Sequence, residues 1–340
     1  MTALRITNPG PAEQKLTTFV EVEVPEPGPD ELRVRVAACG VCHTDLHEVE
    51  GELVLPALPI IPGHEIIGSV DKLGPGVKGP AVGTRVGIPW LASTCGRCRF
   101  CRTGRENLCE DARFTGFHAD GGYAEYTLVR AGYCYPIPRR FADAEAAPLL
   151  CAGVIGLRAL RLAGVAHGES RTGNDRPRLG LYGFGASAHV CLQIARHWDC
   201  EVAVFTRAEI HRRHAAELGA AWVGSADETP PWPLDSSIIF APAGELVPKA
   251  LTQLAKGGTL ALAGIHMSPI PEMEYSLIYD ERTVRSVANS TRRDVTDLLK
   301  LADEIPLKTT VKTYPLDQAQ QALLAVKHST AKAAAVLVMS

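Results

Sequence analysis

The chain has 340 residues, 46% of them hydrophobic, and 35 basic residues against 38 acidic ones give a net charge of −3. This length and composition predict a large core divided between two domains. A near-neutral chain without a long basic run is not expected to bind nucleic acid, and no apolar run is long enough to span a membrane. The first residues, MTALRITNPG, lack the apolar stretch of a secretory signal, so we expect a cytoplasmic protein.

The first part of the chain is predicted to be rich in strands and turns, with a proline-containing loop at residues 25–29. It includes the segment CGVCHTDLHEVEGELVLPALPIIPGHEIIG, in which Cys42 and His64 are plausible zinc ligands and Glu65 follows His64 directly. A catalytic zinc takes three protein ligands, such as two cysteines and a histidine, and keeps one position open. Spacing does not identify the third ligand, because it comes from a distant part of the fold.

Four cysteines then follow within fifteen residues, in the pattern C-x2-C-x2-C-x7-C; they are Cys95, Cys98, Cys101 and Cys109. Cytoplasmic thiols stay reduced, so metal ligation is favoured over disulfides. Four thiolates at about 2.3 Å form the closed tetrahedral shell of structural zinc. An iron–sulfur cluster is less favoured because the C-x3-C-P ending is missing, and a nucleic-acid zinc module would need a basic surface. The arginines around the cysteines would favour thiolate over thiol.

Two features precede the second domain. Cys151, in the stretch APLLCAG, is a candidate metal ligand, although a lone cysteine in such a stretch is more often a core residue. The segment HGESRTGNDRPRLG, residues 167–180, is dense in Gly, Asn, Asp and Pro and is predicted to be an exposed loop without an assigned role.

Residues 179–289 alternate between strand and helix patterns, which predicts a parallel, doubly wound sheet. The predicted strands are LGLY, EVAVFT, SSIIFAPA and TLALAGI, and the predicted helices are ASAHVCLQIARHW, EIHRRHAAELGA and ELVPKALTQLAKGG. The turn after the first strand is a G-x-G-x-x-A variant of the dinucleotide fingerprint, formed by Gly183, Phe184, Gly185, Ala186, Ser187 and Ala188. The first glycine permits the tight turn, the second lets the backbone approach a pyrophosphate, and the alanine lets the helix pack closely.

The second strand of this region bears on the choice of cofactor. NAD enzymes usually offer an acidic residue to the ribose there, but this strand ends in Thr206 and Arg207. Arg207 could neutralise a 2′-phosphate, with a hydrogen bond from Thr206, so NADP(H) is favoured over NAD(H). Glu209 is the counterargument, since a shifted loop would bring it to the ribose.

The motifs GVCHTDLH, PGHEIIG, the four-cysteine segment, LLCAG and LYGFGASAH occur in the order seen in zinc-containing medium-chain alcohol dehydrogenases, and the chain resembles that family from about residue 15 onward. The resemblance is to the bacterial and cinnamyl-alcohol-type members. It implies an α/β protein with a GroES-like, β-rich catalytic domain and a Rossmann cofactor domain. The implied boundaries are 1–150 for the catalytic domain, with a structural zinc lobe at about 90–112, then 151–289 for the cofactor domain and 290–340 for a return segment.

The same resemblance implies roles for individual residues. Two zinc ions are expected, a structural one on the four clustered cysteines and a catalytic one on Cys42, His64 and Cys151. Glu65 would approach the catalytic metal during exchange, and Asp45 would fix the tautomer of the His64 ring. Thr44 would bond the substrate oxygen, His43 would contact the cofactor pyrophosphate, and Trp90 would form a wall of the substrate pocket, with a core role as its alternative.

The proton relay departs from the family pattern. Relatives often end the relay with a histidine a few residues beyond Thr44, and Glu50 is the residue that we align with it. His47 sits three positions earlier. We therefore expect Glu50 to take part in the relay.

The sequence thus predicts a zinc-dependent alcohol dehydrogenase or aldehyde reductase that transfers hydride between a small alcohol or carbonyl compound and NAD(P)(H). A polyol or formaldehyde-type dehydrogenase of the same fold is one alternative. A non-enzymatic zinc scaffold is another, but it leaves the dinucleotide turn unexplained. A homodimer or homotetramer is expected from the resemblance.

Overall fold

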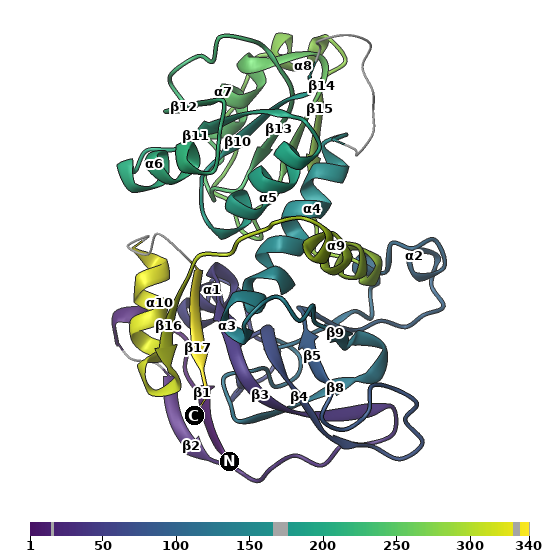
Figure 1. Cartoon of the computed structure of the whole chain (residues 1–340). Helices are drawn as coiled ribbons and strands as arrows, with labels where there is room; N and C mark the ends of the chain where they lie inside the picture. Colours follow the sequence, from purple (N-terminus) through teal and green to yellow (C-terminus); the bar gives the residue numbers. More distant parts are fainter. Residues whose placement is uncertain (15–16, 166–175, 329–333, 340) are drawn as a thin grey trace. The chain divides into compact units, whose positions relative to one another are not determined.

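A computed structural model describes residues 1–14, 17–165, 176–328 and 334–339. The chain forms two compact units (Figure 1). Unit 1 comprises Met1–Cys151 and Asn289–Ser340, and unit 2 comprises Ala152–Ala288. The two units are described separately below.

Unit 1 is built around a mixed sheet with the strand order β16-β17-β3-β4-β5-β9. The strand β8 lies outside this order and pairs with the first half of β3, residues 31–35. Buried and less buried residues alternate along the first half of β3, as expected for a strand with one face on the core. A hairpin of β1 and β2 and a small pair of β6 and β7 lie outside this sheet. The strands are β1 Thr2–Ile6, β2 Thr17–Glu21, β3 Glu31–Val41, β4 Glu65–Leu73, β5 Arg85–Ile88, β6 Leu91–Ser93, β7 Arg113–Phe114, β8 Tyr126–Arg130, β9 Tyr135–Pro136, β16 Val311–Pro315 and β17 Ala334–Val338.

The helices of unit 1 are mostly short. They are α1 His43–Glu50, α2 Arg99–Arg102, α3 Asp143–Ala146, α9 Arg292–Glu304 and α10 Ala319–Lys327, with single 3₁₀ turns η1 Ala12–Gln14, η2 Glu106–Leu108, η3 Ala131–Tyr133, η4 Ala147–Leu150 and η5 Leu316–Gln318. The longest, α9, begins at a capping box in which Thr291 and Asp294 bond each other's backbone amides.

A link joins the segment that carries the clustered cysteines to α9. The buried carboxylate of Glu106, on η2, accepts a hydrogen bond from the backbone amide of Arg292 at 3.1 Å and pairs with the Arg292 guanidinium at 3.4 Å. That guanidinium also lies 5.2 Å from the ring centre of Tyr133. A negative charge at the first turn of a helix is favourable, because the free amides there carry partial positive charge.

Unit 2 is a doubly wound α/β unit. Its six strands are all parallel, in the order β12-β11-β10-β13-β14-β15, which is the strand order of a Rossmann sheet. The strands are β10 Arg178–Tyr182, β11 Glu201–Phe205, β12 Trp222–Gly224, β13 Leu234–Ile239, β14 Leu254–Leu262 and β15 Thr283–Ser286, and the helices are α4 Ala152–Leu162, α5 Ala186–His197, α6 Glu209–Glu217, α7 Leu246–Gln253 and α8 Ser276–Tyr279.

The predicted architecture of a GroES-like β-rich part and a Rossmann part is confirmed, and each predicted strand and helix of the second region is present. Two details differ. The strand β12 was not predicted, because its three residues are too few for a recognisable hydrophobic pattern. The strand β14 begins at Leu254, inside the segment that was expected to be helical. The predicted loop at 167–180 falls largely on residues 166–175, which lie outside the described part of the chain.

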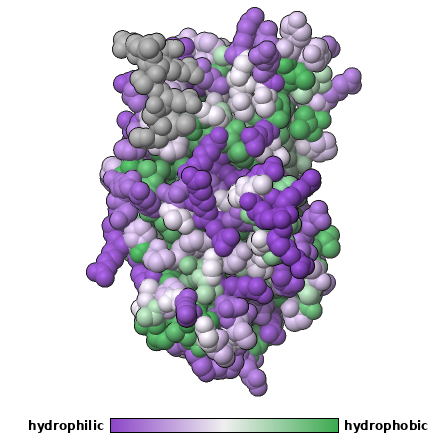
Figure 2. Space-filling model, turned by 90° about the vertical axis from the view of Figure 1, so that its right-hand side faces the viewer, coloured by the Kyte–Doolittle hydropathy of each residue, from purple (hydrophilic) through white to green (hydrophobic). Residues whose placement is uncertain are grey.

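On the face of the molecule seen in Figure 2, hydrophilic residues are widespread and hydrophobic residues form small separate groups between them. In the described ranges, none of the helices combines the length and the hydrophobicity needed to cross a bilayer.

Candidate active site

Four residues that are far apart in the sequence converge in unit 1. The ligand atoms of Cys42, His64, Glu65 and Cys151 all lie within 4.8 Å of one another. The Cys42 sulfur is 3.3 Å from His64 Nε2. This group, called here the mixed group, brings together the three residues expected to hold a catalytic metal and the adjacent carboxylate.

Cys42 owes its position to the start of α1, where it is the N-cap residue. Its sulfur accepts a hydrogen bond from the amide of Thr44 at 3.2 Å. The amide of Cys42 in turn donates a hydrogen bond to the carboxylate of Asp45 at 2.8 Å. The sulfur therefore lies at the positive end of the helix, which favours negative charge. Cys151 reaches the same point from the residue that follows η4.

His64 and Glu65 enter the group at the start of β4, and both are buried. The Nδ1 atom of His64 lies 3.2 Å from the fully buried carboxylate of Asp45, so the opposite ring nitrogen, Nε2, faces Cys42. Burial raises the pKa of Glu65 to about 8, an effect that the nearby His64 opposes. Gly40 provides room for this carboxylate, since a Cβ there would overlap it.

Three further predicted residues lie close to the mixed group. Trp90 is buried, and its ring is 4.8 Å from that of His64 in an edge-on arrangement and 5.1 Å from that of Phe114 in a stacked one. Thr44 is buried on the first turn of α1, beside Cys42. His43 precedes it and is exposed.

Glu50, the residue aligned with the end of the relay, has other contacts. At the last turn of α1 its Oε1 accepts hydrogen bonds from Lys327 at 2.6 Å and from the amide of Ala12 at 3.2 Å. His47 is buried one turn from His43, with ring centres 6.3 Å apart, and its Nδ1 bonds the carboxylate of Glu52.

Sequence reasoning overlooked Glu48. It is fully buried on α1, and neither carboxylate oxygen has a hydrogen-bond partner among the described residues. Burial, and then the charge of Asp45, raise its pKa well above the usual range. A glutamate on a short helix is usually exposed, so no signal in the sequence pointed to this position.

The four clustered cysteines form a second group in unit 1, called here the four-cysteine group. Sulfur–sulfur distances are 3.5 Å for Cys95–Cys109, 3.5 Å for Cys98–Cys101 and 3.9 Å for Cys95–Cys101. Four sulfurs bound to one zinc ion at about 2.3 Å would lie about 3.8 Å apart at the corners of a tetrahedron. The observed spacing is close to that value.

Backbone amides, rather than arginine side chains, favour the thiolate form of Cys95 in this group. The pKa of Cys95 falls to about 7, chiefly because the backbone amides of Arg97 and Cys98 donate hydrogen bonds to its sulfur. Burial instead raises the pKa of Cys109 to about 12. Arg99 and Arg105 lie over the ring of Phe100, 4.6 and 5.5 Å from its centre.

The glycine turn of unit 2 lies between β10 and α5. Gly183 has a φ of 86°, in the left-handed region, and a Cβ there would lie 3.0 Å from the amide nitrogen of Ala241. A Cβ on Gly185 would meet nothing within 4 Å, so the backbone is open on that side. Ala188 is fully buried on α5. The turn sits beside β10, where the strand order of the sheet reverses, which is where Rossmann sheets bind ligands.

Thr206 and Arg207 follow β11, and Arg207 is exposed with its guanidinium in no ion pair among the described residues. Arg212 fixes this loop by donating a hydrogen bond to the carbonyl of Thr206 at 3.1 Å, and it pairs with Glu228 at 3.5 Å. Glu209 pairs instead with Arg213, at 3.4 Å.

Comparison with known proteins agrees with this arrangement. Residues 28–139 match the family model for the alcohol dehydrogenase GroES-like domain, and residues 188–304 match that for zinc-binding dehydrogenase. The fold is therefore that of a dehydrogenase with a GroES-like part and a Rossmann part. The chain belongs to the zinc-containing medium-chain alcohol dehydrogenase family and is an oxidoreductase of the alcohol dehydrogenase type.

Individual relatives cover nearly all of the chain. It is 44% identical to a probable alcohol dehydrogenase, AdhA, of Mycobacterium tuberculosis, over 100% of this chain and 97% of that protein. It is 36% identical to an alcohol dehydrogenase of Geobacillus stearothermophilus, over 87% and 88%. Among solved structures, a cobalt- and zinc-bound thermostable alcohol dehydrogenase from Pyrobaculum aerophilum superposes with a TM-score of 0.88 at 26% identity, over 99% of both chains.

Proposed function

We propose that this protein is a zinc-dependent alcohol dehydrogenase or aldehyde reductase that uses NADP(H) in preference to NAD(H). The observation that carries the proposal is the mixed group, in which two cysteines, a histidine and a carboxylate converge within 4.8 Å. In this proposal residues 1–150 and 290–340 form the catalytic domain, and residues 151–289 bind the cofactor.

Both metal sites suit zinc by the chemistry of their donors. Cys42, His64 and Cys151 are a Cys2His set that leaves a fourth position open, which is typical of catalytic zinc. The four-cysteine group offers a closed shell, which is typical of structural zinc. When bound, catalytic zinc acts as a Lewis acid that lowers the pKa of an alcohol, and the nicotinamide accepts or donates the hydride.

The surrounding residues would orient the ligands and move a proton. Asp45 would hold the proton on Nδ1 of His64, leaving Nε2 free to bind metal. Glu65 would remain available as a nearby carboxylate during exchange at the open position. Trp90 would form the wall of the substrate pocket next to His64.

Thr44 would bond the reacting oxygen and pass its proton onward. Two contacts favour His47 over Glu50 as the end of that relay. His47 lies one helical turn beyond His43, and its Nδ1 bonds the carboxylate of Glu52, which fixes the position of the ring. Glu50 is engaged elsewhere, because its Oε1 accepts hydrogen bonds from Lys327 and from the amide of Ala12.

The cofactor would bind at the glycine turn, with its pyrophosphate near Gly183, Gly185 and the first residues of α5, Ala186–Ala188. The preference for NADP(H) rests on Arg207, whose guanidinium is unpaired within the described part of the chain. Since Glu209 is paired with Arg213, it is a poor candidate for the ribose hydroxyls of NAD.

Small alcohols and aldehydes are the proposed substrates. A polyol or formaldehyde-type dehydrogenase of the same fold remains the alternative, and substrate profiling separates the two. A cytoplasmic location is proposed because none of the ten cysteines is in a disulfide, as expected in a reducing compartment.

We further propose assembly into a homodimer or homotetramer through the cofactor domain. The edge strand β15 is exposed at all four residues, including the apolar Val284, and Tyr275 and Tyr279 nearby are each 68% exposed. An open strand edge is a template for pairing with a second copy. Light scattering during size-exclusion chromatography would give the mass of the assembly.

The decisive test combines a metal assay with parallel titrations of the purified protein with NADPH and NADH. Two zinc ions per chain, tighter binding of NADPH and turnover of an alcohol with NADP⁺ are expected. Protein that contains both metals but binds neither nucleotide would contradict the proposal. Tighter binding of NADH would overturn only the cofactor preference.

A further inference from the structure

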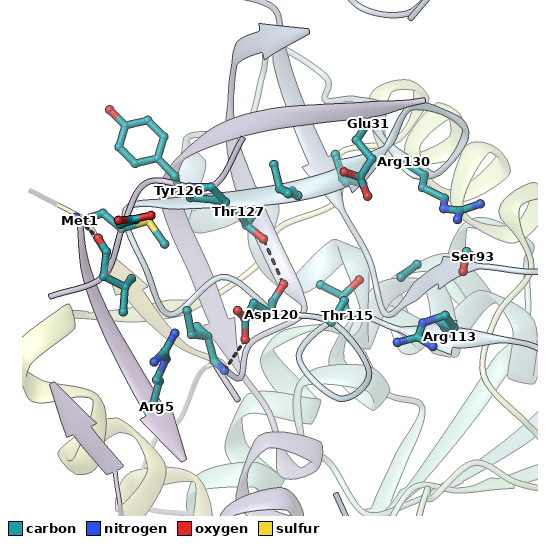
Figure 3. Close-up of a pocket in the computed structure, with 18 residues that line it drawn as sticks. Met1, Arg5, Glu31, Ser93, Arg113, Thr115, Asp120, Tyr126, Thr127 and Arg130 are labelled. Carbon is teal, nitrogen blue, oxygen red and sulfur yellow. Dashed lines mark hydrogen bonds between the residues drawn. The ribbon is translucent and has the colours of Figure 1, made fainter. Parts of the chain in front are cut away.

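Unit 1 contains a cavity of about 520 Å³ whose lining includes all of strand β8 (Figure 3). Neither metal group contributes to its lining, and neither does any residue assigned a role above. A volume in the range of about 300–1,000 Å³ is typical of pockets for small molecules. This space is called here the β8 cavity.

Three arginines from separate strands line the β8 cavity: Arg5 on β1, Arg113 on β7 and Arg130 at the end of β8. In the described ranges none of them forms an ion pair with a carboxylate. Arg113 donates only to the carbonyl of His118, at 2.9 Å. The Nε of Arg5 is buried, and no hydrogen-bond partner for it exists among the residues described. Burying a hydrogen-bond donor without a partner costs free energy, so this end of the lining favours a ligand that also brings an acceptor towards Arg5.

The acidic residues of the lining are mostly engaged by the backbone. Asp120 Oδ1 accepts a hydrogen bond from the amide of Ile61 at 2.9 Å, and Glu31 Oε2 accepts one from the amide of Gly28 at 3.0 Å. Glu31 faces Arg130 across the β3–β8 pair, yet their charged atoms do not come within ion-pair distance. Glu23 is exposed. None of the three guanidinium groups is therefore in an ion pair within the described residues, and those of Arg113 and Arg130 are exposed and open to a dissolved anion.

In the view of Figure 3, Arg5 lies at one end of the β8 cavity and Arg113 and Arg130 at the other, with Asp120 and Thr115 between them. Apolar side chains fill part of the wall, among them Val22, Ile61 and Leu128. A ligand that satisfies this lining carries negative charge and also has an apolar body.

We propose that the β8 cavity binds a small organic anion, with a phosphate or carboxylate group on the guanidinium groups of Arg113 and Arg130 and an apolar body along β8. The planar guanidinium matches both anions with paired hydrogen bonds. The site is separate from the mixed group and does not depend on the proposed reaction.

The test is a calorimetric titration of the zinc-loaded, full-length protein with 1-naphthyl phosphate, in phosphate-free buffer at low salt. NADPH is present in excess to fill the glycine turn, and the titration is repeated with Arg207→Gln to exclude binding at the cofactor phosphate position. Inorganic phosphate and neutral 1-naphthol serve as probes for the charge and for the apolar body separately. The variants are Arg113→Gln and Arg130→Gln, with the exposed Arg139→Gln as the matched control.

Naphthyl phosphate is expected to bind wild type, Arg207→Gln and Arg139→Gln equally, and each cavity variant at least about tenfold more weakly. Naphthol should not bind measurably, and inorganic phosphate should bind more weakly than naphthyl phosphate. Thermal melting of each variant checks that it is folded, and Arg130→Gln removes no contact seen in the described chain. The proposal is overturned if wild type takes up no naphthyl phosphate, if both cavity variants bind it as well as wild type, or if inorganic phosphate binds equally tightly.

Discussion

Asp45 and His64 meet in the interior of unit 1, with the carboxylate 3.2 Å from Nδ1 of the ring, while Nε2 on the other side of the ring is 3.3 Å from the Cys42 sulfur. One buried acid thus determines which nitrogen of the histidine can bind a metal.

Replacing Asp45 by Asn should lower the affinity of the mixed group for zinc by about 10- to 100-fold, because a neutral amide is a weaker acceptor for the Nδ1 proton than a carboxylate and its NH2 end cannot accept that proton at all. Zinc per chain, measured after dialysis against a weak chelator, should fall from two towards one. The exposed Asp303→Asn on α9 is the control and should retain both ions. Two ions in Asp45→Asn after the same dialysis would show that the carboxylate does not support the ligand.

Replacing Cys98 by Ser should remove the other zinc ion, because the closed shell of the four-cysteine group loses one ligand. We expect about one ion per chain and a lower melting temperature, since structural zinc contributes to folding free energy. The matched control is Cys134→Ala, a buried thiol outside both groups, which should keep two ions. Two ions in Cys98→Ser would argue against the proposed site.

Arg207→Gln should weaken the binding of NADPH by about tenfold or more and leave NADH nearly unchanged, since only the former carries the 2′-phosphate. Fluorescence titration with both nucleotides measures this. Arg213→Gln, which breaks only the exposed pair with Glu209, is the control. Equal losses for the two nucleotides would point to a contact with a part of the cofactor that they share.

His47→Gln and Glu50→Gln distinguish the two candidates for the proton relay. His47→Gln should change the dependence of turnover on pH, because it removes the imidazole proposed to receive the proton from Thr44. Glu50→Gln should leave that profile unchanged and lower stability slightly, since it breaks the ion pair with Lys327. Zinc content is checked in both. The reverse result, with an altered profile only in Glu50→Gln, would restore the alignment-based assignment.

Arg140→Ala should destabilise unit 1 by about 1–2 kcal/mol. The guanidinium of Arg140 donates to the carbonyls of Ala302, Ile305 and Leu307 at the end of α9, where the helix leaves its acceptors unpaired and the partial charge is negative. Urea unfolding measures the loss, and the neighbouring exposed Arg139→Ala should behave like wild type. If both variants lose the same amount of unfolding free energy, the effect does not come from the hydrogen bonds of Arg140 to the end of α9.

The sequence predicted best where the chemistry is local. The four clustered cysteines needed only their spacing, because a fifteen-residue loop can close on one ion without help from the rest of the fold. Gly183 and Gly185 were recognisable because a strand and a helix flank them. Cys151 was only an uncertain candidate by itself, since its approach to Cys42 depends on how distant segments pack.

What escaped prediction depends on neighbours that are distant in the sequence. Glu48 looks like a solvent-facing helix residue until the packing around α1 buries it. Glu50 bonds Lys327, and His47 bonds Glu52. Neither partner belongs to the short motif by which Glu50 was aligned with the end of the relay. The β8 cavity draws its arginines from three strands, none of which carries a motif.

The contact between Glu106 and Arg292 spans 186 positions of the chain. The cysteine-bearing segment therefore emerges from the ribosome long before the residue to which it is tied. During synthesis it can collect its metal early, but it can be secured against α9 only after translation has passed Arg292. A nascent chain arrested before that point should carry a metal-loaded segment that a protease still cuts, and release of the full-length chain should protect it.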